Sequence, residues 1–261
     1  MNEGTYHRLK SIIQLETSDR FEYIQTEANK IGGDIRAYDI QSPRGVDRHI
    51  SLNINNNNDS EVWFTANYDT FEKFPSANNN ASGVITLLGM GNKIEKMDLP
   101  IDVRLFFLDA GLDQKLVAKK QRDNDFVPGS ELLVSYMLNN EIEFIDKYTG
   151  TFVVQAVGKG NLCVFDKTGK KEVNSYNLNE KIVKYGQSIN IPVEIQEKSP
   201  LADNISFLKQ GLESTVIARY QEGSWHRMQT PKDDISNVNP KIIDETIEFL
   251  VNFLESYKVQ K

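Results

Sequence analysis

The sequence is 261 residues long, with 30 Lys and Arg against 37 Asp and Glu, and its formal net charge is −7 at pH 7. A chain this acidic is not expected to bind the phosphate backbone of nucleic acids, and no apolar run approaches the ~20 residues that span a membrane. The only cysteine is Cys163, which excludes an intramolecular disulfide and a thiolate-rich metal site. The N-terminal stretch lacks the features of a secretory signal. We therefore expect a cytoplasmic α/β protein without a nucleic-acid or membrane partner.

Hydrophobic spacing in the first 60 residues predicts two short helices followed by strands. An apolar stripe over residues 6–13 predicts the first helix, and the second should run from Ser18 to the Gly32-Gly33 pair. Alternation of apolar and polar residues predicts strands over 34–40 and 49–54, with a turn at Asn55–Asp59. These strands and the next one should form a meander.

The rest of the chain alternates strands and helices, which is typical of a sheet with helices on both faces. The expected strands are residues 62–66, 101–108, 152–154, 162–165, 193–196 and 214–218, and the expected helices are 82–97, 128–138, 172–189, 205–210 and one that begins near Asn239. No internal repeat or linker composition interrupts this order. We therefore predict a single domain over 1–261, with the N-terminal helices and first strands in 1–60 and the motif-bearing core in 61–258.

Several common chemistries have no motif in this sequence. A G-x-S-x-G nucleophile elbow and a phosphate-binding P-loop are both missing. Cys163 lies in an apolar run, which is typical of a buried core thiol rather than a nucleophile. The charged segment Lys115–Asp125 is short of core residues, so we expect a mobile surface loop with a solvated face. Its Lys119, Lys120 and Arg122 could contact an acidic partner.

Two motifs lie in a strand–loop–helix context over residues 62–90. A buried strand ends in Asn67-Tyr68-Asp69, and Ala77-Asn78-Asn79-Asn80-Ala81-Ser82-Gly83 opens the next helix. Five further features follow in order: a strand that ends near Asp109, Pro128-Gly129-Ser130, a strand that ends near Gln155, Ala202-Asp203-Asn204, and Gln229-Thr230-Pro231-Lys232-Asp233. In this order and at these spacings, the motifs resemble the core of the M28 family, the zinc aminopeptidases related to glutaminyl cyclases.

This resemblance covers most of Val62–Phe253 and implies the family fold. That fold is a single α/β domain with a central mixed, mostly parallel sheet of about eight strands and helices on both faces. In the family, two zinc ions bridged by a carboxylate activate a water molecule, and a glutamate takes its proton. The positions that match the family site are Asn67, Asp69, Asn79, Gly111, Leu112, Gln155 and Gln229.

Most of these positions hold residues that cannot perform the family's chemistry. Neutral amides stand at Asn67, Asn79, Gln155 and Gln229. Amides are poor zinc ligands beside imidazole and carboxylate, and neither Gly111 nor Leu112 can accept a proton. Asp69 is retained, but the resemblance implies that it orients a neighbouring ligand rather than binding the metal. We therefore expect no catalytic residue, no bound metal and no cofactor.

The sequence thus predicts a pseudoenzyme on the M28 scaffold, with a neutral polar cleft that binds a peptide, a small polar ligand or a protein partner. The expected ligand-binding residues are Asn67, Asp69, Asn79, Gln155, His226 and Gln229, with Leu112 beside them. Ligands of open α/β sheets gather at the carboxyl ends of the strands. The cleft should therefore lie where the strands finishing at Asn67, Asp109 and Gln155 end.

Two enzymatic alternatives stay open from the sequence. The first is an aminopeptidase-like hydrolase with a rebuilt or single-metal site, which would use zinc or a more weakly bound metal such as Mg²⁺. Candidate ligands for it are Asp69, Asp109, Asp113, Asp203 and His226. The second is a cyclase-like transferase that would use Trp225, His226 and Asp69, because Trp225-His226 is similar to the Trp-His pair of glutaminyl cyclases.

Overall fold

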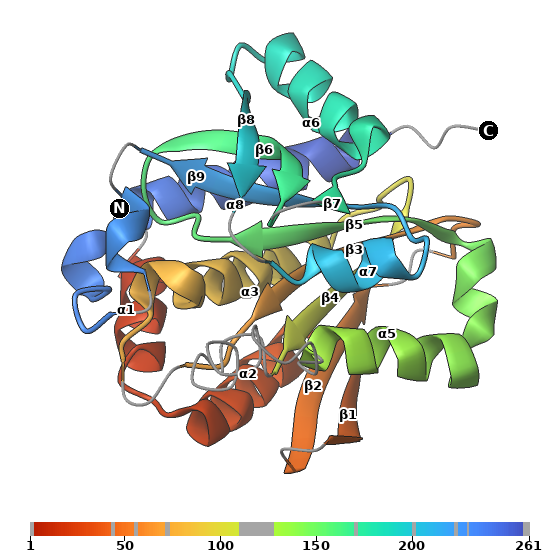
Figure 1. The fold of residues 1–261 in the computed structure, drawn as a ribbon, viewed down its shortest axis with the longest axis horizontal. Helices are drawn as coiled ribbons and strands as arrows, with labels where there is room; N and C mark the ends of the chain where they lie inside the picture. The colour runs from red at the N-terminus through yellow and green to blue at the C-terminus, as the bar shows by residue number, and fades with distance from the viewer. Residues whose placement is uncertain are drawn as a thin grey trace.

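A mixed nine-stranded sheet organises the molecule (Figure 1). The computed structural model describes residues 3–42, 45–54, 57–70, 74–109, 128–169, 172–199, 202–221, 224–228 and 230–257. The strands are β1 (Asp34–Ser42), β2 (Gly45–Ile54), β3 (Glu61–Asn67), β4 (Asp102–Leu108), β5 (Tyr148–Gln155), β6 (Asn161–Thr168), β7 (Glu172–Val173), β8 (Glu194–Ser199) and β9 (Ser214–Tyr220). Their order across the sheet is β1-β2-β4-β3-β5-β9-β6-β7, and β8 pairs with β6.

Seven α-helices are described, together with four short helical turns. The helices are α1 (Glu3–Ile12), α2 (Thr17–Ile31), α3 (Ser82–Ile94), α5 (Gly129–Asn140), α6 (Tyr176–Ser188), α7 (Asn204–Lys209) and α8 (Pro240–Glu255). The turns are η1 (Ala77–Ala81), η2 (Ile142–Asp146), η3 (Ser224–Arg227) and η4 (Ile235–Asn237). Among the described helices, none is both long and apolar enough to cross a lipid bilayer.

Two apolar layers cover the faces of the sheet. The larger layer packs α1, α2, α3, α6 and α8 against one face, and it includes Phe64, Leu105 and Phe152 from the central strands. The smaller layer packs α5 and α7 against the other face, around Trp63 and Phe106. In Figure 1, α5 and α7 lie in front of the sheet and α8 lies behind it. Because both faces are covered, every residue of β3 is buried, as expected for a short apolar run in a central strand.

The expectation of a mostly parallel sheet is wrong. The pairs β3–β4, β3–β5, β5–β9 and β6–β8 are parallel, and the pairs β1–β2, β2–β4, β6–β9 and β6–β7 are antiparallel. Two features of the chain produce the mixture of parallel and antiparallel pairs. The turn after β1 returns β2 as an antiparallel hairpin partner, and the short connection after β5 sends β6 back against β9.

The predicted start of the helix over residues 172–189 is also wrong. Glu172 and Val173 instead pair with β6 as the short strand β7. The helix α6 begins at Tyr176, because the side chain of Ser175 accepts a hydrogen bond from the backbone N–H of Leu178 and caps the first turn. The charged segment Lys115–Asp125 lies outside the described residues.

The close approach of α3 to β5 generates a stability prediction. A Cβ atom added at Gly83 would lie 2.5 Å from the carbonyl oxygen of Val154, a backbone atom that cannot move aside. We expect Gly83→Ala to lower the free energy of unfolding by ~1–3 kcal/mol, the usual cost of overpacking. Chemical denaturation monitored by circular dichroism measures this change.

The matched control is Gly91→Ala, the same substitution in the same helix. A Cβ atom at Gly91 would meet only side-chain methyl groups, at 3.2 Å or more, and alanine gains ~1 kcal/mol of helix propensity over glycine. We expect this variant to stay close to the parent in stability. Equal stability of the two variants would contradict the assigned packing of α3 on β5.

Candidate functional site

The carboxyl ends of the central parallel strands meet at one edge of the sheet. In the β3–β4 pair, Asn67 lies opposite Leu108, and Asp109 follows directly. In the β3–β5 pair, Thr65 lies opposite Val153, so Asn67 and Gln155 each stand two residues further on at neighbouring strand ends. The structure therefore brings the predicted strand ends together at this edge.

The loop before α3 carries Asn79 to the same edge. The turn η1 departs from helical geometry at Asn79 and Asn80, and the peptide bond between them is cis. The side chain of Asn80 donates to the carbonyl oxygen of Val154 at 2.9 Å and accepts from the backbone N–H of Ala156 at 3.1 Å. These two hydrogen bonds fix the loop against the end of β5.

A single carboxylate holds the other side of this loop. The Oδ1 atom of Asp233 accepts from the backbone N–H of Asn78 at 2.9 Å, and its Oδ2 atom accepts from the backbone N–H of Asn79 at 3.0 Å. The side chain of Asn237 also donates to Oδ1 at 2.9 Å. Burial raises the pKa of Asp233, while these three hydrogen bonds act in the opposite direction.

At the centre of the edge, two amide side chains bind each other. The Nε2 atom of Gln155 donates to Oδ1 of Asn79 at 3.2 Å, and Asn79 is fully buried. The Nδ2 atom of Asn79 has no hydrogen-bond acceptor among the described residues. A buried donor without an acceptor costs ~1–3 kcal/mol, so an oxygen atom supplied by a ligand would be stabilised here.

A second buried pair lies at the end of β3. The Nδ2 atom of Asn67 donates to Oδ1 of Asp69 at 3.1 Å, and both residues are buried. Asp69 thus binds the amide that stands at the neighbouring position of the motif. This contact is the one expected if the carboxylate positions residue 67.

A buried arginine lies close to these acids. The guanidinium group of Arg20 donates to the carbonyl oxygens of Leu15, Tyr68 and Pro75, at 3.1, 3.3 and 2.8 Å. Burial lowers its pKa to about 10, while the charges of Asp69 and Asp233 oppose that shift. The carboxylates of Asp69 and Asp233 therefore both compensate the positive charge of Arg20.

Other predicted residues fall in three groups. Trp225, in the turn η3, contacts the rings of Phe165 and Tyr220 and lines a small cavity together with Gln155. His226 belongs to the same turn, but its side chain lies outside the described part of the structure. The positions wholly outside the described residues are Gly111, Leu112, Asp113 and Gln229.

Cys163, expected to be a core thiol, and Asp203, a candidate metal ligand, both lie in the protein interior. Cys163 is buried in β6 and its thiol donates to the carbonyl oxygen of Ala218 at 3.5 Å. Burial raises the pKa of this thiol to about 12, so it is not a thiolate at neutral pH. Asp203 precedes α7, and burial raises its pKa to about 6, while a hydrogen bond with Ser130 acts in the opposite direction.

Arg20 was not predicted from the sequence, and Asp233 was predicted only as part of the last motif, with no role in the site. Arg20 carried a detectable signal, since it is the charged member of the buried stripe of α2, with Phe21, Ile24 and Ala28. Asp233 closes the last motif, but only the three-dimensional structure shows that it binds backbone N–H groups of the loop before α3. Among the described residues, no three His, Cys, Asp or Glu side chains form a group that could hold a metal ion.

Solved structures with this architecture are zinc-aminopeptidase-like α/β proteins. Glutaminyl cyclase from Porphyromonas gingivalis has a TM-score of 0.75 and 14% identity, covering 97% of each chain. The LapA aminopeptidase of Legionella pneumophila has a TM-score of 0.75 and 12% identity, covering 97% of this chain and 71% of its own. A leucine aminopeptidase precursor from Bacteroides thetaiotaomicron has a TM-score of 0.75 and 15% identity, covering 98% of this chain and 97% of its own. Because these sequence identities are low, the similarity to these structures shows a shared fold alone.

The class defined by this fold is therefore a single α/β domain of the zinc-aminopeptidase type. The sequence profile of peptidase family M28 matches residues 49–254. The chain belongs to peptidase family M28. None of the curated protein sequences compared with it matches.

The buried charges near Arg20 generate a stability prediction for Asp69. Asp69→Ala removes the acceptor of the Asn67 amide and one of two carboxylates that compensate Arg20. We expect a loss of ~1–3 kcal/mol in the free energy of unfolding, measured by urea denaturation at pH 7. The exposed Asp98 supplies the control, because Asp98→Ala changes the net charge equally. A similar effect of both substitutions would mean that Asp69 compensates no buried charge.

The raised pKa of Asp203 predicts how stability depends on pH. Between the ordinary pKa of 3.8 and about 6, the folded state holds more protons than the unfolded state, so the free energy of unfolding falls as the pH rises. The ionised carboxylate costs roughly 3 kcal/mol above pH 6. We expect Asp203→Asn to be more stable than the parent at pH 7.5, with the difference shrinking toward pH 4.

Thermal and urea unfolding of Asp203→Asn across pH 4–8 checks this. The exposed Asp59 offers a matched control, and Asp59→Asn should follow the parent profile. A constant offset between Asp203→Asn and the parent at every pH would show that ionisation of Asp203 is not the cause.

Proposed function

We propose that this protein is a non-catalytic member of family M28 that binds a peptide or small polar ligand in a neutral cleft. The observation that carries this proposal is the hydrogen bond between Asn79 and Gln155. By resemblance, Asn79 stands where the family holds the bridging carboxylate, and Gln155 stands where it holds the next aspartate. Two amides that bind each other here supply no negative charge for a pair of cations.

The residues at the family's ligand positions do not fit two zinc ions. Imidazole nitrogen and ionised oxygen are the usual zinc donors besides thiolate, but the described residues offer the amides of Asn67, Asn79 and Gln155. Asn79 directs its buried Nδ2 donor to no acceptor among the described residues, and an N–H donor repels a cation. Asp69 binds the amide of Asn67, and its charge also compensates Arg20.

The same arrangement supports recognition of a neutral polar group. An amide carbonyl of a peptide could accept from Nδ2 of Asn79, and the exchange would satisfy a donor that is otherwise unpaired.

Catalytic relatives define the competing hypothesis. The solved structures similar to this chain include aminopeptidases and glutaminyl cyclases, so a rebuilt single-metal hydrolase is the alternative that an experiment must test. It would need a metal ligand set that draws on residues beyond the amide pair. Metal content separates the two hypotheses directly.

We expect the purified protein to retain far less than one zinc ion per chain after gel filtration without added metal, since the amide positions offer no anionic donor. Elemental analysis of the eluted protein measures this. Aminopeptidase and glutaminyl cyclase substrates, assayed with added Zn²⁺ and Mn²⁺, should show no turnover above that of Asp69→Ala. Two zinc ions per chain, or metal-dependent turnover that this substitution abolishes, would overturn the proposal.

Binding itself is tested by titrating short peptides into the parent and into Gln155→Leu. The substitution removes the amide that binds Asn79 and should weaken the affinity of a cleft ligand by ~10-fold, the loss of one good polar contact. Gln187→Leu, on the exposed side of α6, is the control and should leave the affinity unchanged. Equal weakening in both variants would place the ligand elsewhere.

A further inference from the structure

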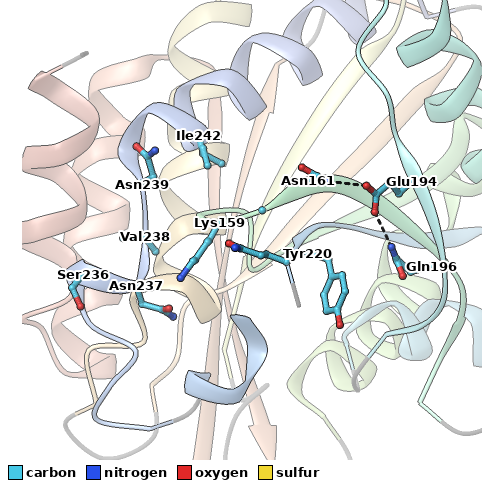
Figure 2. Close-up of a pocket in the computed structure, with 12 residues that line it drawn as sticks. Lys159, Asn161, Glu194, Gln196, Tyr220, Ser236, Asn237, Val238, Asn239 and Ile242 are labelled. Atoms are coloured by element: carbon cyan, nitrogen blue, oxygen red, sulfur yellow. Dashed lines mark hydrogen bonds between the residues drawn. The ribbon is translucent and has the colours of Figure 1, made fainter. Parts of the chain in front are cut away.

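A second pocket lies beside the candidate site and shares none of the residues predicted for it. Figure 2 shows its lining, with Lys159 between two walls. One wall is the segment that leads into α8, and the other is formed by the beginnings of β6 and β8 and the end of β9. Its cavity volume of about 730 Å³ falls within the range of ~300–1,000 Å³ that is usual for small-molecule sites.

Lys159 supplies a positive charge inside this pocket. Its side chain lies between the walls (Figure 2), and it forms no ion pair or hydrogen bond with any other described residue. An ammonium group in such a position binds a carboxylate well, because the pocket limits its contact with water. The pocket therefore offers an anion a partner that the protein does not use itself.

The N-terminal end of α8 adds to that positive potential. This helix is 16 residues long and begins at Pro240, directly after its N-cap residue Asn239. The backbone N–H of Asn239 donates to the carbonyl oxygen of Gly158 at 2.8 Å, which fixes the helix end against the loop that carries Lys159. A helix N-terminus carries a partial positive charge that favours a nearby anion.

An unpaired acceptor lies at the base of the same wall. Asn237 is fully buried, and its Nδ2 atom donates to Asp233, which leaves its Oδ1 atom without a donor among the described residues. Figure 2 shows its amide pointing toward Lys159. An acceptor buried in this way costs free energy until a donor reaches it, so the pocket favours a ligand that carries N–H groups as well as an anion.

A fixed negative charge lies on the opposite wall. The two carboxylate oxygens of Glu194 accept hydrogen bonds from the amides of Asn161 at 2.8 Å and Gln196 at 2.9 Å (Figure 2). These amides hold the carboxylate in place without neutralising its charge. Tyr220 lies beside it and contributes an aromatic ring to the lining. The pocket therefore separates one cationic group from one anionic group.

We propose that this pocket binds a zwitterion with a free α-carboxylate and a free ammonium group, which is the chemistry of an amino acid or a short peptide. The carboxylate would bind Lys159 near the start of α8. The ammonium and amide N–H groups would face Glu194 and Asn237. This site is separate from the Asn79–Gln155 cleft and does not rest on the function proposed for it.

Isothermal titration calorimetry tests the proposal with defined probes. Alanine and tri-alanine share the two charged ends, and comparison of their affinities distinguishes a free amino acid from a peptide. Tri-alanine blocked by N-acetyl and C-amide groups lacks both charges, and maltose tests a neutral polyhydroxyl ligand. We expect at least one of the two zwitterions to bind with an affinity that Lys159→Met weakens. Any binding of the blocked peptide, which the Asn79–Gln155 cleft could accept, should be unaffected by Lys159→Met, and maltose should not bind.

Variants then assign the binding to the pocket. Lys159→Met and Glu194→Gln should each weaken the affinity for the zwitterion by ~10-fold or more, which is the effect of losing one charge-assisted contact. The exposed Lys232, outside the lining, supplies the control Lys232→Met with the same change in net charge.

Three results would overturn the proposal. One is the absence of zwitterion binding up to about 10 mM, the weak limit of small-ligand recognition. Another is a loss of affinity in Lys159→Met that is as large for blocked tri-alanine or maltose as for the zwitterions. The third is an affinity that survives both Lys159→Met and Glu194→Gln, or that falls equally in Lys232→Met.

Discussion

The hydrogen bonds to the carboxylate of Asp233 determine the geometry of the sheet edge where the carboxyl ends of β3 and β5 meet. Its oxygens accept from the backbone N–H groups of Asn78 and Asn79 and from the side chain of Asn237. One side chain thereby ties the loop before α3 to the segment before α8. Since Asn79 lies in the candidate cleft and Asn237 lines the neighbouring pocket, both sites share this support.

Charge balance accounts for the acids that lie close to the amides of Asn67 and Asn79. Arg20 is buried, and among the described residues it donates to the backbone carbonyl oxygens of Leu15, Tyr68 and Pro75. A buried guanidinium group requires compensation, and the charges of Asp69 and Asp233 supply it. The amides of Asn67 and Asn79 provide hydrogen bonds at the strand ends without adding charge.

Local patterns in the sequence predicted most of the fold. The buried run of β3 and the apolar stripe of α8 follow from their spacing, and the motif order indicated the M28 family, which the family profile confirms. Strand direction was not predictable in this way, because the reversal of β6 against β9 depends on how a short connection packs. The site was predicted only in part for a similar reason. Arg20 belongs to a segment with no motif, and its role arises from contacts with distant parts of the chain, at Tyr68 and Pro75.

The hydrogen bonds from Asp233 to the loop have a consequence for how this scaffold changes over time. They engage the main chain at residue 79, and Asn80 supplies two further anchors, to Val154 and Ala156. These anchors do not involve the side chain at position 79, which adds one hydrogen bond to Gln155. A substitution there alters the chemistry offered to a ligand while the supporting architecture persists, so binding specificity on this scaffold can diverge without a prior loss of folding.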